Sequence, residues 1–223
     1  PADQVVFNGD VSALAEGLLG DGVRAAAPAV SRPQRGLSAV TWCLRGRPSG
    51  FPLHYHNVFF DRDYAAEFDA IFSDRRVVER PTVYLCAQDR IAGRDPGGPE
   101  RMLLLVNAPA DGDSRQWREE ELLALRDRAL SVLSQCGLEL AFTDDECRAS
   151  SPTDFAGLFP GSGGSLYGRA AHGMMASFAR PGAASAVPGL YLAGGSVHPG
   201  PGVPMSALSG RLAAEAIVAA SAG

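Results

Sequence analysis

Short apolar runs, most of them bounded by glycine, proline or polar residues, recur along the whole chain. Runs of this length are typical of β-strands and are too short for a core helix. The pattern predicts strands at residues 5–7, 37–44, 53–60, 82–87, 101–107, 138–142 and 190–193.

Other segments repeat their apolar residues with the period of an α-helix. Residues 61–72 place Tyr64, Phe68, Ile71 and Phe72 on one face. Residues 114–136 form the longest predicted helix, with an expected buried face of Trp117, Leu122, Leu125, Ala129, Val132 and Leu133. A shorter helix is predicted at residues 13–19, capped by Asp10 or Ser12. The order of these elements predicts an α+β layer, in which helices lie on one side of a sheet.

The stretch from Gly189 to Val218 reads as a strand, a glycine-rich turn and a helix. Residues 194–204 contain four glycines and three prolines, too many for the interior of a strand or a helix. Residues 205–220 are rich in alanine, and Pro204 suits the first helical position. This geometry presents backbone N–H groups and the positive end of a helix to an anionic ligand. The alternative is a plain connector, which is common in α/β proteins.

Residues 147–188 are rich in loop-forming residues but carry many apolar side chains. We expect these side chains either to pack under the sheet or to line an apolar cavity, with core packing favoured. They are Phe155, Leu158, Phe159, Leu166, Tyr167, Met174, Met175 and Phe178.

Composition narrows the function classes. The 223 residues carry a net charge of −5 without a basic block, so nucleic-acid binding has no electrostatic support. The four cysteines are irregularly spaced, which favours reduced, mostly packed thiols and a cytosolic setting. No uninterrupted apolar run reaches the roughly 18 residues of a membrane span, and no signal peptide is evident.

The sequence offers little support for a metal site or a hydrolase triad. His54 and His56 share a face of a predicted strand, but no third ligand is near in sequence, so structural packing is favoured over a metal site. Ser196 and Ser209 lie near His198 without a GxSxG elbow, so a hydrolase triad is unsupported. We expect no metal site, and no residue can be named as the catalyst.

The chain opens directly with an apolar, strand-like run at residues 5–7 and lacks an initiating methionine. This beginning suggests the later part of a longer chain. The alternative is that only a short leader is missing.

Several stretches together form a specific pattern: residues 2–10, 54–61, 63–72, 151–155 and 189–214. In this order they resemble the second half of the bacterial phytoene-desaturase-type flavoproteins. Residues 164–182 and 194–205 are most similar to the hydroxycarotenoid 3,4-desaturase, or methoxyneurosporene dehydrogenase, branch.

The resemblance implies an FAD-dependent carotenoid desaturase that removes two hydrogens from a polyene, with a hydride passing to flavin N5. The implied fold is α/β: an α+β substrate domain plus the C-terminal part of a Rossmann-like FAD domain, as a fragment of a two-domain flavoprotein. Residues 1–20 and 188–220 would belong to the FAD domain and residues 37–150 to the polyene-binding domain. Residues 151–187 would be a return segment that lines the cavity. The strand at Leu190 would then pair beside residues 5–7.

The cofactor-binding residues carried over from the resemblance lie in the glycine-rich turn: Gly194, Gly195, Ser196, His198, Gly202, Val203, Pro204 and Met205. For His198, contact with the flavin or substrate competes with a turn-stabilising hydrogen bond, which is favoured; His172 poses the same question. Two features depart from the family. No GxGxxG βαβ unit is present, which implies that the pyrophosphate-binding half is missing. Gly195 stands where many relatives carry an acidic residue.

The implied partners are a hydrophobic polyene and the missing N-terminal half. The implied location is cytoplasmic, with peripheral contact at the inner membrane left open. Two other readings remain: a redox-inactive lipid- or carotenoid-binding protein, and a related enzyme of the flavin amine oxidase or retinol-saturase type.

Overall fold

The computed structural model describes residues 2–61, 63–91, 93–170 and 176–221. The chain divides into two units, each with its own internal contacts. Unit 1 comprises Pro1–Leu37 and Phe155–Gly223, and unit 2 comprises Ser38–Asp154. The helix α4 (Pro152–Leu158) carries the chain across the boundary between them.

Unit 2 is built on an antiparallel sheet in the order β3-β4-β5-β2-β6, with β7 also paired to β2. The long strand β2 (Ser38–Ser49) is its centre, because it pairs with β5 along one side and with β6 and β7 along the other. The remaining strands are β3 (His56–Phe59), β4 (Val83–Ala87), β5 (Glu100–Ala108), β6 (Glu139–Ala141) and β7 (Cys147–Ser150).

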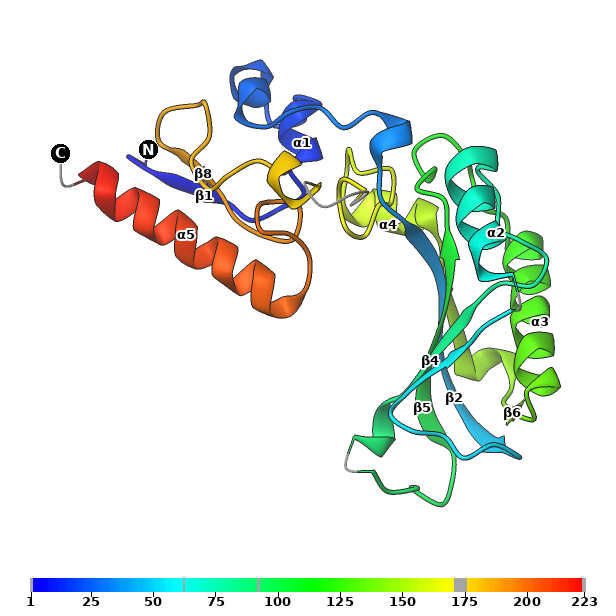
Figure 1. Cartoon of the computed structure of the whole chain (residues 1–223). Coiled ribbons are helices and arrows are strands. Elements are labelled where there is room, and N and C mark those ends of the chain that lie inside the picture. The colour runs from blue at the N-terminus through cyan, green and yellow to red at the C-terminus, as the bar shows by residue number, and fades with distance from the viewer. Residues whose placement is uncertain (1, 62, 92, 171–175, 222–223) are drawn as a thin grey trace. The chain divides into compact units, whose positions relative to one another are not determined.

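One face of this sheet is covered by α2 (Tyr64–Asp69) and α3 (Glu119–Gln135), as Figure 1 shows. Alternate residues of β2, β4 and β5 point to this side and form the core with α3. The buried residues of α3 are Leu125, Ala129, Val132 and Leu133, on the face that the helical period predicts. The predicted α+β layer with helices on one side is therefore confirmed.

The buried face of α2 and the turn after it matches the prediction at Ile71 but not at Tyr64. Tyr64 is 44% exposed, and the residues that α2 and the following π turn (Ala70–Asp74) bury are Glu67, Ala70 and Ile71. Glu67 is buried because its carboxylate accepts hydrogen bonds from Thr82 N and Asn107 Nδ2. The predicted aromatic residues contact one another instead: Tyr64 meets Phe68 edge to face, and Phe68 stacks on Phe72.

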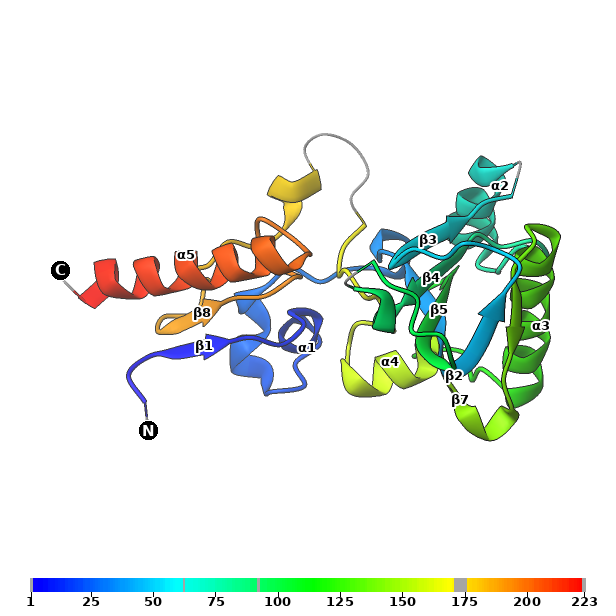
Figure 2. The same cartoon turned by 90° about the horizontal axis from the view of Figure 1, so that it is seen from below.

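Unit 1 is centred on two short strands from opposite ends of the chain. β1 (Val5–Phe7) and β8 (Leu190–Leu192) pair in parallel, with Val5 opposite Leu190, which confirms the predicted pairing. Along β8 the side chains alternate. Leu190 and Leu192 pack in a cluster with α1 (Ser12–Ala15), whereas Tyr191 packs against α5 (Val203–Ser221). Figure 2 shows α5 running alongside the strand pair.

Several element boundaries differ from the sequence prediction for local reasons. The helix at residues 13–19 is only α1, because Gly17 takes a left-handed φ of 72°. β7 and α4 arise in a stretch read as loop, since β2 pairs with β7. α5 begins at Val203, so Pro204 is its second residue rather than its first.

Two expectations about apolar and thiol side chains are wrong. The expected core packing of apolar residues between 155 and 178 is wrong for Leu158, Phe159, Tyr167 and Phe178, which are exposed. Met174 and Met175 lie outside the described residues. In its described part before residue 171, this segment is shaped by glycine turns and polar contacts rather than by apolar burial. Of the four free cysteines, Cys43 and Cys136 are exposed rather than packed. Cys43 points to the sheet face without helices, and Cys136 ends α3.

Helix α5 has a length and composition that would allow it to cross a bilayer, although no unbroken apolar run is present. Length and composition do not distinguish a span from a helix whose apolar side packs on protein. Here Ala213, Ala216 and Ile217 pack against β8.

The buried ion pair between Arg90 and Glu100 gives a stability prediction for unit 2. Glu100 is 1% exposed and accepts bidentate hydrogen bonds from Arg90, at 2.9 and 2.7 Å. Glu100→Gln removes the buried partner of Arg90 and leaves only the exposed Asp95, so we expect the free energy of unfolding to fall by about 3 kcal/mol. Urea unfolding followed by the fluorescence of Trp42 and Trp117, which both lie in unit 2, measures this change.

Glu79→Gln is the matched control, because Glu79 is exposed where it pairs with Arg128. We expect this variant to lower the free energy of unfolding by less than about 1 kcal/mol. Equal losses in the two variants would contradict the role given to the buried pair.

Candidate functional site

The carboxyl ends of β1 and β8 lie together because the two strands are parallel. Residues 8–10 follow β1, and residues 194–196 follow β8. Together with a loop from residues 159–168 they line a hollow of about 180 Å³, here called the strand-end hollow. Its lining is Asn8, Gly9, Asp10, Phe159, Ser165, Leu166, Gly168, Gly194, Gly195 and Ser196. Ligands of open α/β sheets bind at this end of the strands.

The loop after β8 is held in place by hydrogen bonds from three directions. The N–H of Gly194 donates to Ser209 Oγ of α5 over 2.8 Å, and that hydroxyl donates to Ser206 O. The N–H of Val11 donates to Ser196 Oγ over 3.2 Å. Ser209 is fully buried, so these contacts fix the loop from inside the protein.

The third contact comes from Arg180, whose guanidinium joins two loops of unit 1. It donates to the carbonyl of Gly195 over 3.1 Å and to the carbonyls of Tyr167 and Arg169, each over 2.8 Å. Arg180 is 7% exposed. Burial lowers the pKa of this guanidinium, and the negative charge of Asp10 opposes the shift.

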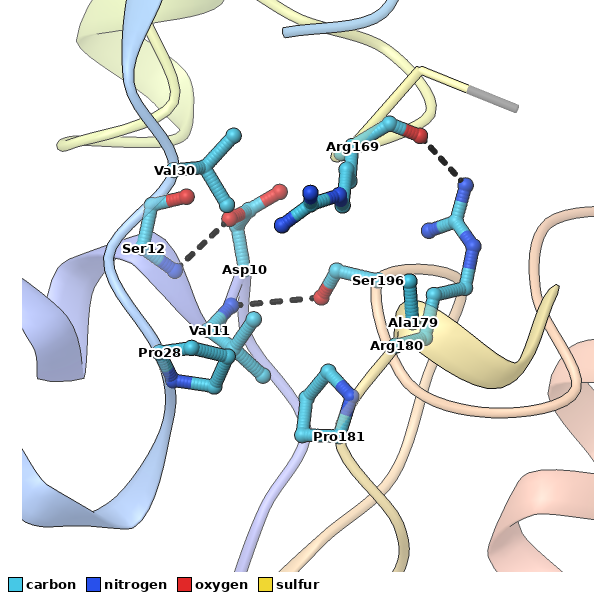
Figure 3. A pocket seen from close by; sticks show the side chains of 11 residues that line it. Asp10, Val11, Ser12, Pro28, Val30, Arg169, Ala179, Arg180, Pro181 and Ser196 are labelled. Atoms are coloured by element: carbon cyan, nitrogen blue, oxygen red, sulfur yellow. Dashed lines mark hydrogen bonds between the residues drawn. The ribbon is translucent and has the colours of Figure 1, made fainter. Parts of the chain in front are cut away.

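Beside the strand-end hollow is a small recess lined by Asp10, Ser12, Arg169, Arg180 and Ser196 among others (Figure 3). Asp10 accepts a hydrogen bond from Ser12 N over 2.9 Å, which ties the turn after β1 to the start of α1. The two openings share Asp10, Gly168 and Ser196, so they form one polar region.

The predicted cofactor-binding residues fall into two groups. Gly194, Gly195 and Ser196 line the strand-end hollow. His198, Gly202, Val203, Pro204 and Met205 do not line it, and Val203 is 86% exposed at the start of α5. Gly202 has a φ of 106°, and a Cβ there would meet nothing within 4 Å.

His198 makes contacts within its own unit. Its N–H donates to Pro181 O over 2.9 Å, and its ring stacks on Phe178. These contacts tie the glycine-rich turn to the preceding segment. His172 lies outside the described residues.

The other candidate histidines do not form a ligand set. His54 precedes β3, and its N–H donates to Asn57 Oδ1. His56 Nδ1 lies 2.7 Å from Tyr84 Oη. Within the described part of the chain, no three His, Cys, Asp or Glu residues are grouped so as to hold a metal ion.

Comparison with known proteins assigns the family. The model of the flavin containing amine oxidoreductases matches residues 1–218. The chain belongs to this family. The mixed α/β architecture expected for a flavoprotein of this type is thereby confirmed.

Its relatives include proteins named for carotenoid chemistry. The chain is 57% identical over 98% of its length to the hydroxyneurosporene desaturase of Rubrivivax gelatinosus. It is 48% identical over 98% to the hydroxyneurosporene desaturase of Cereibacter sphaeroides, and 32% identical over 97% to the 1-hydroxycarotenoid 3,4-desaturase of a Flavobacterium species. It spans 42%, 43% and 44% of these relatives, respectively.

Sequence reasoning did not identify Arg180 as part of the site. A single arginine in a loop has no periodic signal, and only the fold shows that it faces three carbonyl groups. Asn8, Gly9 and Asp10 line the strand-end hollow only because β1 pairs with β8, and no local pattern in these residues shows that role. Ser209 could have been noticed as a polar residue on the apolar side of a helix.

Ser209→Ala tests how the loop is held. The substitution leaves the Gly194 N–H without its acceptor, so we expect its hydrogen exchange to accelerate by about 10- to 100-fold. Exchange measured on peptides that cover residues 192–200 reports the change. Ser221→Ala on the exposed end of α5 is the control and should leave these residues unchanged. Unaltered exchange in the Ser209 variant would mean that other contacts hold the loop.

Proposed function

We propose that this chain is the C-terminal portion of an FAD-dependent carotenoid desaturase and that unit 1 forms one side of its flavin site. The observation that carries the proposal is the strand-end hollow, where the carboxyl ends of two parallel strands meet a glycine-rich loop before a long helix. Family membership supports a flavin as the ligand.

The residues present fit such a cofactor. The lining includes Gly9, Gly168, Gly194 and Gly195, which bring the backbone within reach of a ligand without intervening side chains. Ser196, Asn8 and Asp10 add polar groups to the rim. In place of the acidic side chain that many relatives carry at Gly195, the neighbouring backbone and these groups would bind the cofactor. Gly202, Val203 and Met205, at the positive end of α5, would face its anionic part.

The proposed roles follow the two units. The segments 1–20 and 188–220 lie in unit 1 and would belong to the FAD domain, while residues 37–150 lie almost entirely in unit 2 and would bind the polyene. Residues 151–187 would return the chain and line the cavity. The pyrophosphate-binding half would precede this chain, since the relatives are more than twice as long.

The proposed substrate is a hydroxylated carotenoid, as the names of the relatives indicate for those proteins. When bound, the flavin supplies the acceptor for the hydride that leaves the polyene. The contribution of this chain is to position the cofactor through the loop that Arg180 and Ser209 hold, and to exclude water from an apolar substrate. The proposed location is cytoplasmic, with peripheral contact at the inner membrane where such a substrate is dissolved.

Gly195→Glu in the full-length protein tests the flavin site. A Cβ at Gly195 would meet Pro201 Cα at 3.5 Å and Ser206 Oγ at 3.6 Å, so the fold accepts a side chain there. The carboxylate would restore the acidic group that many relatives carry at this position and give the cofactor a hydrogen-bond acceptor, so we expect the affinity for FAD to rise by roughly tenfold. Flavin absorbance of the purified protein, titrated with FAD, measures the change.

Gly182→Glu is the matched control, because Gly182 is exposed in the same unit and a Cβ there meets nothing within 4 Å. It should bind FAD like the parent. A full-length parent that binds carotenoid but no flavin would overturn the enzyme proposal in favour of a redox-inactive binding protein. Oxidation of amines instead of carotenoids would favour an amine oxidase.

A further inference from the structure

The sheet of unit 2 has a second face, which α2 and α3 do not cover (Figure 1). The register places two adjacent rows of side chains across β3, β4, β5 and β2 on this side. We call them the uncovered face: His56, Cys86, Leu103 and Cys43 in one row, and Val58, Tyr84, Leu105 and Thr41 in the next.

The eight residues of the uncovered face include no Asp, Glu, Lys or Arg. Arg148 of β7, which is exposed, continues the row beyond Cys43, on the side of the sheet away from His56. Val58 is 46% exposed, and Leu103 and Leu105 are half-buried between the neighbouring strands. The nearest charged residues of β2 and β5 are Arg45 and Arg101, one row beyond Cys43 and Leu103. Such a surface suits an elongated hydrocarbon rather than a charged ligand.

Two polar side chains interrupt it at one end. His56 Nδ1 lies 2.7 Å from Tyr84 Oη, and the two rings are stacked with centroids 5.9 Å apart. The ring of Tyr55 packs edge-on against His56 at 4.5 Å. These contacts fix the imidazole in one orientation, although His56 is exposed.

The hydrogen bond also decides what His56 can offer a ligand. If Tyr84 donates to Nδ1, then Nε2 carries the proton and is a donor; if Nδ1 donates to Tyr84, then Nε2 is an acceptor. A hydroxyl group can both donate and accept, so it can bond to Nε2 in either tautomer. A carbonyl oxygen or an ammonium group can bond in only one of the two.

We propose that His56, oriented by Tyr84, binds the hydroxyl end group of the hydroxylated polyene, while the apolar rows contact its hydrocarbon chain. This inference rests on the function proposed above. A hydroxyl removed from water without a partner is costly, so a site with a partner favours the hydroxylated polyene over its parent hydrocarbon. His56 and Tyr84 are thus specificity-determining residues.

The test compares two substrates in the full-length holoenzyme: hydroxyneurosporene and neurosporene. We expect His56→Phe, which keeps a ring but loses both nitrogens, to lower kcat/KM for hydroxyneurosporene by about tenfold or more and to leave neurosporene within about twofold. Tyr84→Phe should also lower kcat/KM for hydroxyneurosporene relative to neurosporene, but by less than His56→Phe does. The imidazole remains in this variant but is no longer held in one orientation. His56→Gln, which places an amide near Nε2, should restore part of the preference.

His54→Phe is the matched control, an exposed histidine two residues away that lies outside β3. It should leave the substrate ratio unchanged. If His56→Phe lowers both substrates equally or neither, the assignment of the hydroxyl site is wrong while the proposed function stands. If the parent holoenzyme converts neither carotenoid, the proposed function itself fails and this inference fails with it.

Discussion

Two three-residue strands from opposite ends of the chain, β1 and β8, pair in parallel in unit 1. A two-stranded sheet this short has little stability of its own in water. It persists because β8 packs on both sides, with Leu190 and Leu192 among the residues around α1 and Tyr191 and Ala193 against α5, while Val5 and Val6 of β1 stay exposed. The parallel direction then places the ends of both strands at one edge. The strand-end hollow follows from this single pairing.

The loop that follows β8 is held in place by hydrogen bonds. Residues after β8 are held by the buried hydroxyl of Ser209, the buried guanidinium of Arg180 and the N–H of Val11. A loop held through its backbone can keep glycine at the positions that approach a ligand. Unit 2 is organised differently, because helices cover one face of its sheet and complete the core. On the opposite face of the sheet, His56 and Tyr84 form a hydrogen bond.

Periodicity predicted the elements whose burial is one-sided, such as the buried stripe of α3 and the strand–turn–helix of β8 and α5. It failed where polar contacts decide the packing. Glu67 turns α2 so that it, rather than Tyr64, faces the sheet, because its carboxylate has two partners there. Likewise, Phe159 and Phe178 were expected in the core but are exposed, whereas Arg180, which has no periodic signal, is buried. Motif resemblance correctly predicted a flavoprotein, yet the hollow joins only Gly194, Gly195 and Ser196 of the predicted cofactor residues.

The most direct test of the central claim, that the ends of β1 and β8 form one side of the flavin site, is a crystal structure of the full-length protein with FAD bound. The account predicts cofactor density in contact with residues 8–10 and 194–196, with the loop held by Arg180 and Ser209 as it is here. Density for FAD elsewhere, with the strand-end hollow filled by side chains of the remaining protein, would contradict it.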